Sequence, residues 1–274
     1  MKPAPFEYVA AASVDEAVGA LAAGWDEAKV LAGGQSLVPL LNMRLARPVL
    51  LVDVNRIPGL DAIRADGRLE LGALVRQSDA LASNDLAKAA PLLHVALRHI
   101  GHPATRSRGT IGGSVAHADP AAELPAALLA LDAEVIAVGP RGERTIAAGE
   151  LFLGPFTTSL APDELLTAVR VPLQGPRRFG FAELARRHGD FALAGVAVLL
   201  DPARVVLFGV GGVPVRALEA EQALDGRADA AEAAELATRG LEPVSDVHAD
   251  GDYRRRAAAV LVRRALEQAE ARGA

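Results

Sequence analysis

The sequence predicts an α+β fold made of two α/β subdomains and a smaller C-terminal α/β domain. Residues 29–52 read as strand, glycine turn, helix and strand, which is a βαβ unit. After residue 58 the expected strands are joined by loops as well as by helices. Proline, glycine and arginine cluster at 174–178 between two apolar runs, which favours a domain boundary. We therefore expect a domain over 1–175, with subdomains of about 1–57 and 58–175, and a C-terminal domain over 176–274.

The first subdomain begins with a capped helix. Ser13 and Glu16 form a capping box, because the serine hydroxyl accepts from an unpaired amide of the first turn and the glutamate reaches back to another. Gly24 ends this helix. The elements that follow are a strand at 29–32, a turn at Gly33-Gly34, a helix from Ser36 to Pro48 and a strand at 49–52. Such continuous apolar strands are typical of a parallel sheet.

The remaining elements mix short strands with helices. In the second subdomain we expect strands at 69–75, 134–138 and 165–171, helices at 78–79, 85–100 and 121–131, a polar loop at 102–110 and a second glycine turn at 111–114. In the C-terminal domain we expect adjacent strands at 191–200 and 204–215, a turn at Asp201-Pro202, and helices at 217–239 and 253–272.

The composition excludes several classes of protein. Because the chain contains no cysteine, it cannot by itself form a disulfide framework, a cysteine zinc site, a thiolate nucleophile or an iron–sulfur cluster. Its 34 acidic residues outnumber its 29 basic ones, which argues against general nucleic-acid binding. The longest apolar run, 191–200, is far shorter than the ~20 residues of a membrane-spanning helix, and the first residues do not resemble a secretory signal. We expect a soluble, cytoplasmic protein.

Two glycine-rich segments are candidate ligand-binding loops. Ala32 to Leu37 lies between a strand and a helix, where glycines allow close approach to a ligand and successive amides can point at an anion. Thr110 to Ser114 repeats this pattern, so the two together suit both phosphates of a pyrophosphate. For either loop alone, a purely structural turn is the alternative. The chain has neither a P-loop nor a complete GxGxxG motif, since Pro214 replaces the third glycine of 209–214.

The segment after the second glycine turn carries three polar residues of interest. His117, Asp119 and Glu123 suit hydrogen bonds to ribose or ribityl hydroxyls. For the two carboxylates, capping of the following helix is the alternative interpretation.

Other histidines and arginines have simpler interpretations. His94, His99 and His102 lack the carboxylate spacing of a zinc motif, so we interpret them as packing or surface residues and expect no metal site. Four arginines form either a salt-bridged surface or a patch that faces a partner subunit: Arg177, Arg178, Arg186 and Arg187.

Three motifs taken together resemble a known family. They are Lys29-Val-Leu-Ala-Gly-Gly-Gln-Ser-Leu37, Arg108-Gly-Thr-Ile-Gly-Gly-Ser-Val-Ala-His-Ala-Asp-Pro-Ala-Ala-Glu-Leu-Pro125 and Arg187-His-Gly-Asp-Phe-Ala192. Over essentially its whole length the chain resembles the FAD-binding medium subunit of molybdenum hydroxylases, most closely the carbon monoxide dehydrogenase type and more distantly the flavin domain of xanthine dehydrogenases. This resemblance implies a flavin fold of the vanillyl-alcohol oxidase (PCMH) type, followed by the C-terminal domain of these flavoproteins.

The resemblance also implies a set of residues that bind non-covalent FAD. The pyrophosphate would be wrapped by Lys29, Val30, Leu31, Ala32, Gly33, Gly34, Gln35, Ser36 and Leu37. The other side of the cofactor would be lined by Ile100, Gly101, Gly109, Thr110, Ile111, Gly112, Gly113 and Ser114. The sugar and ribityl portions would lie near His117, Asp119 and Glu123, and the isoalloxazine edge near Asp190 and Phe191. The xanthine dehydrogenase branch has a ring-contacting lysine where this chain has Leu193.

The function implied is that of an electron-transferring oxidoreductase subunit. Electrons would arrive from [2Fe-2S] clusters on a small subunit, after oxidation of a substrate at a molybdenum cofactor on a large subunit, and would leave FAD for an external acceptor. The assembly would be a dimer of heterotrimers, and no catalytic acid, base or nucleophile is expected on this chain. The alternatives are a free-standing FAD oxidase or reductase with its own small substrate, and a nucleotide-binding module without redox chemistry.

Overall fold

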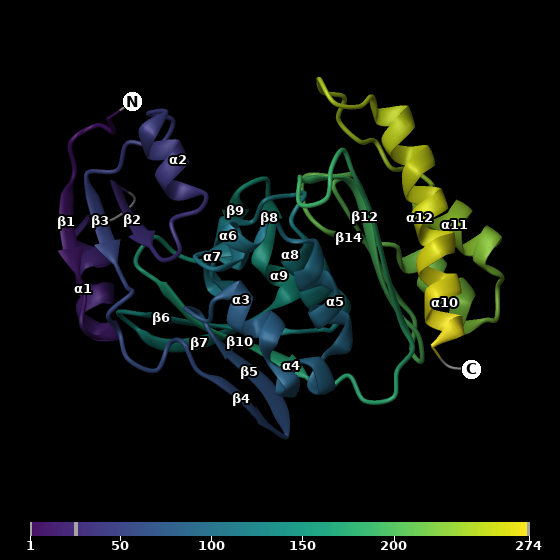
Figure 1. Cartoon of the computed structure of the whole chain (residues 1–274), viewed down its shortest axis with the longest axis horizontal. Coiled ribbons are helices and arrows are strands. Elements are labelled where there is room, and N and C mark those ends of the chain that lie inside the picture. Colours follow the sequence, from purple (N-terminus) through teal and green to yellow (C-terminus); the bar gives the residue numbers. More distant parts are fainter. Residues whose placement is uncertain (1, 25–26, 273–274) are drawn as a thin grey trace.

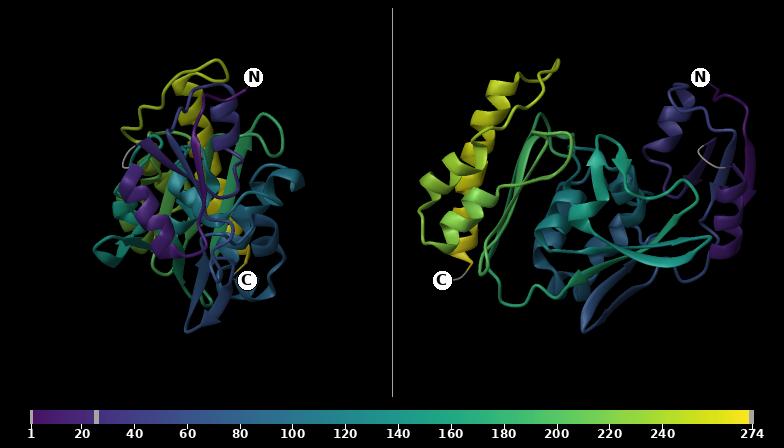
Figure 2. Two further views of the ribbon diagram at one scale, coloured as in Figure 1. Left: turned by 90° about the vertical axis from the view of Figure 1, so that its left-hand side faces the viewer. Right: turned by 180° about the vertical axis from the view of Figure 1, so that it is seen from behind.

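Three parts of the chain lie side by side in the computed structural model, which describes residues 2–24 and 27–272. The N-terminal subdomain, the second subdomain and the C-terminal domain follow one another along the longest axis of the molecule (Figures 1 and 2). The second subdomain therefore contacts both of its neighbours in sequence. Among the described residues, no helix combines the length and the apolar character needed to cross a membrane.

The N-terminal subdomain is a three-stranded parallel sheet in the order β1-β3-β2. Its elements are β1 (Glu7–Ala10), α1 (Val14–Gly24), β2 (Ala28–Leu31), α2 (Leu37–Asn42) and β3 (Leu50–Asp53). The expected βαβ unit is confirmed, because β2 and β3 pair in parallel and α2 lies between them in the sequence. The capping box is confirmed as well: Ser13 Oγ accepts from the Glu16 amide at 3.1 Å, and Glu16 Oε2 accepts from the Ala12 amide at 2.8 Å.

One expected helix of this subdomain is shorter than the sequence pattern indicates. α2 ends at Asn42 rather than at Pro48. Arg44 adopts a left-handed backbone conformation with φ 58°, which the helix cannot continue through. The amides of Leu45 and Ala46 both donate back to the carbonyl of Leu40, so the chain turns here before β3 begins.

The second subdomain is built on a five-stranded antiparallel sheet in the order β4-β5-β10-β6-β7. Its strands are β4 (Ile63–Asp66), β5 (Arg68–Gly72), β6 (Glu134–Gly139), β7 (Gly142–Ala147) and β10 (Leu165–Pro172). One face is covered by α3 (Gln77–Ala82), α4 (Asn84–Ala89), α5 (Pro91–His99), α7 (Ile111–His117) and α8 (Glu123–Ala130). Shorter elements are α6 (Pro103–Arg106), α9 (Ala148–Leu151), β8 (Phe152–Gly154) and β9 (Thr157–Thr158).

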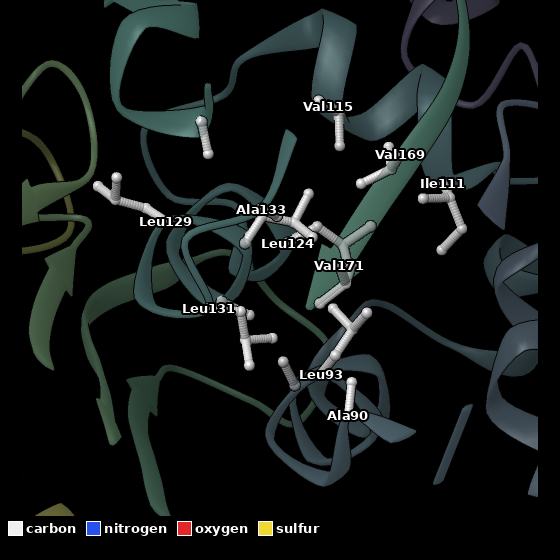
Figure 3. Close-up of a cluster of buried hydrophobic side chains, with 14 of the residues drawn as sticks. Ala90, Leu93, Ile111, Val115, Leu124, Leu129, Leu131, Ala133, Val169 and Val171 are labelled. Atoms are coloured by element: carbon white, nitrogen blue, oxygen red, sulfur yellow. The ribbon is translucent and has the colours of Figure 1, made fainter. Parts of the chain in front are cut away.

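A continuous apolar core joins this sheet to its helices. Figure 3 shows Leu93 of α5, Leu124 of α8, and Val169 and Val171 of β10 within one cluster of buried side chains. All eight residues of α8 are buried, because the helix lies between this sheet and the sheet of the C-terminal domain. Pro125 is tolerated because it occupies the first turn of α8, where its missing amide has no helical partner.

Several expectations for this subdomain are wrong in detail. The strand expected at 69–75 ends at Gly72, and the hairpin partner β4 was not expected. The loop expected at 102–110 contains α6, which Pro103 begins. The glycine turn expected at 111–114 is instead the first turn of α7. Thr110 is its N-cap and accepts through Oγ1 from the Gly113 amide at 3.0 Å.

The C-terminal domain is a four-stranded antiparallel sheet covered on both faces. Its strands, in spatial order, are β11 (Phe179–Ala185), β12 (Ala192–Leu199), β13 (Arg204–Phe208) and β14 (Val215–Arg216), and its helices are α10 (Leu218–Asp225), α11 (Ala230–Thr238) and α12 (Gly251–Ala271). One face packs on these three helices and the other on the helices of the second subdomain. Every residue of β12 is buried for this reason. The expected strand at 204–215 is two strands, and the expected helix at 217–239 is two helices.

Candidate cofactor site

The first glycine loop offers a row of free backbone amides. It connects β2 to α2, and Gly34 takes the left-handed φ of 72° that glycine adopts without strain. Within the described part of the chain, no protein atom accepts a hydrogen bond from the amides of Gly33, Gly34, Gln35 or Ser36. Four consecutive unpaired amides at a partly exposed loop suit an anion such as a phosphate.

The second glycine segment works differently, because its amides are already used. The amides of Ile111 and Gly112 donate to the carbonyls of Val75 and Ala73 at 3.0 and 2.9 Å, and the amide of Ser114 donates to the carbonyl of Thr110. A side chain at Gly112 would collide with Ala73, whose Cβ lies 2.6 Å from the position of an added Cβ. The expectation that this segment repeats the first loop is therefore corrected. The residues of 110–114 supply a close-packed wall and not a second row of amides.

The two segments nevertheless lie against each other, as expected. A Cβ added at Gly33 would overlap the carbonyl oxygen of Arg108, and one added at Gly113 would lie 3.9 Å from the Cβ of Ala32. Only glycine at position 33 permits this close approach. The residues 29–37 and 108–114 therefore form one continuous surface.

Asn55 and Arg76 hold this surface together, and the sequence analysis missed both. Asn55 Nδ2 donates to the carbonyls of Ala32 at 2.9 Å and Leu31 at 3.3 Å. Arg76 donates through Nη2 to Asn55 Oδ1 at 2.8 Å and through Nη1 to the carbonyl of Arg108 at 2.6 Å. Arg76 thus connects the first glycine loop with the segment that leads into the second. Asn55 could have been found, because it follows β3 at the same carboxyl edge of the parallel sheet as the glycine loop; no sequence signal marks Arg76.

His117 at the end of α7 and Asp119 after it are half-buried, and Glu123 is buried. Asp119 Oδ1 accepts from the Ala121 amide at 2.9 Å within the turn before α8, whose N-cap is Ala122, so this carboxylate does not cap the helix as the alternative interpretation proposed. Burial lowers the pKa of His117, whose ring centroid lies 5.1 Å from that of Phe156. Glu123 begins α8 with only 6% of its surface exposed, and burial raises the pKa of its carboxyl to about 7.

The segment 186–191 brings the last two expected residues close to Gly101. The amide of Asp190 donates to the carbonyl of Arg187 at 3.1 Å, and Phe191 is 68% exposed just before β12 begins. Gly189 packs on Gly101, whose carbonyl oxygen lies 2.6 Å from the position of an added Cβ. Such an exposed aromatic ring at the start of a buried strand is available for contact with a ligand.

Other candidates from the sequence analysis lie elsewhere. Arg178 pairs with Asp201 at 3.1 Å, which favours the salt-bridged interpretation for this arginine, while Arg177 donates to the backbone carbonyl of Pro202 at 2.7 Å. Leu193 is buried within β12. Across residues 2–24 and 27–272, no group of three or more metal-ligating side chains comes together.

Comparisons with known proteins cover nearly the whole chain. Residues 4–174 match the family described as the FAD binding domain in molybdopterin dehydrogenase, and residues 179–269 match the CO dehydrogenase flavoprotein C-terminal domain. The chain is 47% identical to the 6-hydroxypseudooxynicotine dehydrogenase complex subunit alpha of Paenarthrobacter nicotinovorans, covering 98% of this chain and 96% of the relative. It is 38% identical to the carbon monoxide dehydrogenase medium chain of Hydrogenophaga pseudoflava, covering 99% of each.

Solved structures show the same likeness in three dimensions. A carbon monoxide dehydrogenase chain from Hydrogenophaga pseudoflava superposes with a TM-score of 0.95 at 39% identity, covering 100% of both chains. A chain of quinoline 2-oxidoreductase from Pseudomonas putida 86 superposes with a TM-score of 0.94 at 37% identity, covering 100% of both. The fold and the paired glycine segments thus define an FAD-binding flavoprotein with the expected two-part architecture. The chain belongs to the FAD-binding medium subunits of molybdenum hydroxylases of the carbon monoxide dehydrogenase type, and so is a subunit of a multi-subunit oxidoreductase.

FAD, the cofactor of this family, fits the residues present. The four unpaired amides of the first glycine loop match the anionic pyrophosphate of a dinucleotide. The glycines at positions 33 and 112 are required by close packing of the protein itself. Gly34 and the unpaired amides beside it are therefore the part of the loop that is available to bind the cofactor.

Proposed function

We propose that this chain receives electrons from iron–sulfur clusters on a small subunit and passes them through FAD to an external acceptor. The observation that carries the proposal is the row of unpaired amides at 33–36, on a chain whose family binds FAD. The absence of cysteine supports it, since the iron–sulfur ligands must then come from another polypeptide. Bound FAD supplies the redox chemistry, while this chain binds it, orients it and tunes its surroundings.

The residues proposed to hold FAD are those named from the sequence. The segment 29–37 would bind the pyrophosphate through its amides, and residues 100–101 and 109–114 would form the opposing wall. His117, Asp119 and Glu123 would lie at the sugar and ribityl chain, with Asp190 and Phe191 at the ring edge. The domain division proposed is 1–175 for FAD binding, with subdomains of about 1–57 and 58–175, and 176–274 for the C-terminal domain.

The proposed partners are a large molybdenum-cofactor subunit and a small iron–sulfur subunit, in a dimer of heterotrimers in the cytoplasm. Relatives whose names include "medium subunit" or "complex subunit alpha" support a multi-subunit assembly. Because the molybdenum site would lie on another chain, the residues of this chain do not select the organic substrate.

Purification of the tagged chain from its native cells tests the proposal. We expect two further polypeptides, molybdenum, iron and FAD to co-purify, and reduction of the flavin when the substrate of the molybdenum site is added. A monomer that oxidises an organic donor unaided would instead identify a free-standing oxidase. A colourless protein that binds a nucleotide but no flavin, even after reconstitution, would leave only the nucleotide-binding module.

A further inference from the structure

A buried carboxyl group and a histidine face each other where the C-terminal domain meets the second subdomain. Glu183 lies on β11 and His99 is the last residue of α5; Glu183 Oε2 and His99 Nδ1 are 3.7 Å apart. The Glu183 side chain is only 4% exposed, and its Oε2 makes no hydrogen bond. A buried carboxyl oxygen without a partner is costly, so its presence calls for a functional explanation.

The groups around this pair favour its neutral form. Glu123 faces Glu183 from α8, and His188 faces His99 from the segment 186–191, with ring centroids 6.4 Å apart. Burial first, and then the Glu123 charge, raise the pKa of Glu183 to about 8. Burial first, and then His188, lower the pKa of His99. The short Glu183–His99 separation is therefore not an ion pair at neutral pH, and one proton resides on the carboxyl.

The other face of β11 contributes no charge to the pair. Along β11, Gly180 packs on Ala265 of α12, whereas Phe181 faces α5 and its ring centroid lies 4.9 Å from that of His99. Strand alternation places Glu183 on the same face as Phe181. The charged side chains of α12 are thus separated from the carboxyl by the sheet itself.

The pair adjoins residues of the proposed flavin site. His99 precedes the wall residues Ile100 and Gly101, and His188 is exposed two residues before Asp190. Gly189 packs on Gly101, which brings the two segments into contact. Glu123 belongs both to the proposed ribityl contacts and to the surroundings of Glu183. Two titratable groups, His99 and His188, therefore lie between Glu183 and the proposed flavin edge.

We propose that Glu183 stores a proton that moves through His99 and His188 to the flavin edge when electrons reach FAD. This inference rests on the proposed function, which supplies the electrons from the small subunit. Reduction of FAD by two electrons takes up at least one proton; that proton leaves the Glu183 carboxyl, passes over the imidazole nitrogens of His99 and His188, and is replaced from solvent at exposed His188. On reoxidation the proton held at the flavin edge leaves to solvent through His188 while Glu183 stays protonated, so one proton is taken up and one is released in each cycle.

The purified complex with Glu183→Gln tests the proposal, with Glu242→Gln, an exposed carboxylate of the same domain, as the matched control. In the unmodified complex we expect the midpoint potential of FAD to change its pH dependence near pH 8, the pKa of Glu183. Glu183→Gln should remove this change and reduce the protons taken up per flavin reduced. His99→Gln should slow proton uptake without removing the change near pH 8. The control should match the unmodified complex.

A second readout does not depend on turnover. Infrared spectra of the full chain without FAD should contain a protonated carboxyl band that disappears as the pH rises through about 8 and that is missing in Glu183→Gln. The inference is overturned if this band is absent, or if both variants retain the pH profile and proton uptake at normal FAD content. A complex whose flavin is not reduced at all by the molybdenum-site substrate would refute the proposed function instead, while the infrared band would still test the proton store.

Discussion

Arg76 donates a hydrogen bond to Asn55 Oδ1 at 2.8 Å and thereby ties together two parts of the proposed FAD surface, which come from the two proposed subdomains. On one side, Asn55 holds the carbonyls of Leu31 and Ala32 in the first glycine loop. On the other side, Arg76 holds the carbonyl of Arg108. Since the first glycine loop and the residues around Arg108 lie outside helices and strands, these side-chain contacts fix their separation.

Loss of the Arg76 guanidinium should weaken FAD binding. Hydrogen bonds from charged groups contribute about 1.5–3 kcal/mol, so Arg76→Ala should raise the dissociation constant of FAD about tenfold to hundredfold. Asn55→Ala should have a similar effect, and the double variant should be little worse than either alone, because both residues act in one network. Fluorescence titration of the apoprotein with FAD measures this.

The control for Arg76 is Arg64→Ala, which removes an arginine that pairs with Glu70 on the outer face of the second sheet. Its FAD affinity should equal that of the unmodified chain, since exposed ion pairs contribute little and this one is remote from the glycine loops. Unchanged affinity in Arg76→Ala and Asn55→Ala would show that the loops keep their positions without this link.

Gly33→Ala should separate the two loops. The added Cβ would overlap the Arg108 carbonyl oxygen, so either segment must shift, and the FAD dissociation constant should rise by at least about tenfold. Gly19→Ala is the matched control, because Gly19 lies in α1 with no atom within 4 Å of the added Cβ. That control should leave FAD binding unchanged and stabilise α1 by about 0.5–1 kcal/mol. Equal affinity in the two variants would contradict the close-approach argument.

The glycine loop, the βαβ unit and the capping box were predictable because each depends on neighbours in the sequence. Apolar strands, a Gly-Gly pair and a Ser-x-x-Glu spacing are local signals. The second glycine segment was mistaken for a turn, since Thr-x-Gly-Gly-Ser reads equally well as a turn and as a capped helix start. Its conformation is decided by the carbonyls of Ala73 and Val75, which accept from its amides and lie 36 to 39 residues earlier in the chain.

The buried pair of Glu183 and His99 could not be found in the sequence for a similar reason. His99 was interpreted as a packing residue because its helix carries no metal motif, and Glu183 carries no local signal at all. Their proximity arises only when β11 packs on α5, with 83 residues between them in the chain. Asn55 and Arg76 likewise meet only through tertiary packing.

The stability of the chain should fall as the pH rises from about 4.5 to about 8. The pKa values of Glu123 and Glu183 are raised from 4.5 to about 7 and about 8, so the folded chain binds more protons than the unfolded chain over this range. Their contribution is complete below about pH 4.5 and is lost as the pH passes about 7 and about 8, with each group contributing at most about 1.4 kcal/mol per pH unit. Urea unfolding of the full chain at a series of pH values measures this trend.

The variant Glu183→Gln identifies the group responsible. The glutamine cannot ionise, so the variant lacks this pH-dependent loss. Between about pH 6 and pH 9 the free energy of unfolding of the unmodified chain should therefore fall relative to that of the variant. The same series with Glu242→Gln should follow the unmodified chain. Parallel curves for all three proteins would show that Glu183 titrates as an ordinary surface carboxyl.

Gly180→Ala should destabilise the C-terminal domain while leaving the FAD loops intact. A Cβ at this position of β11 would overlap the carbonyl of Ala265 in α12, and neither the strand nor the helix can move far because β11 also packs on α5. Overpacking of this kind costs about 1–3 kcal/mol or more, so the thermal unfolding midpoint should drop by several degrees. Gly149→Ala is the matched control, since its added Cβ meets only Leu129 Cδ1 at 3.8 Å, an ordinary contact. The affinity for FAD below the unfolding transition should be nearly unchanged in both variants, because residues 29–37 and 108–114 lie in the other two parts of the molecule; a large loss of affinity in Gly180→Ala would mean that the α12–β11 contact also positions the segment 186–191 at the flavin edge.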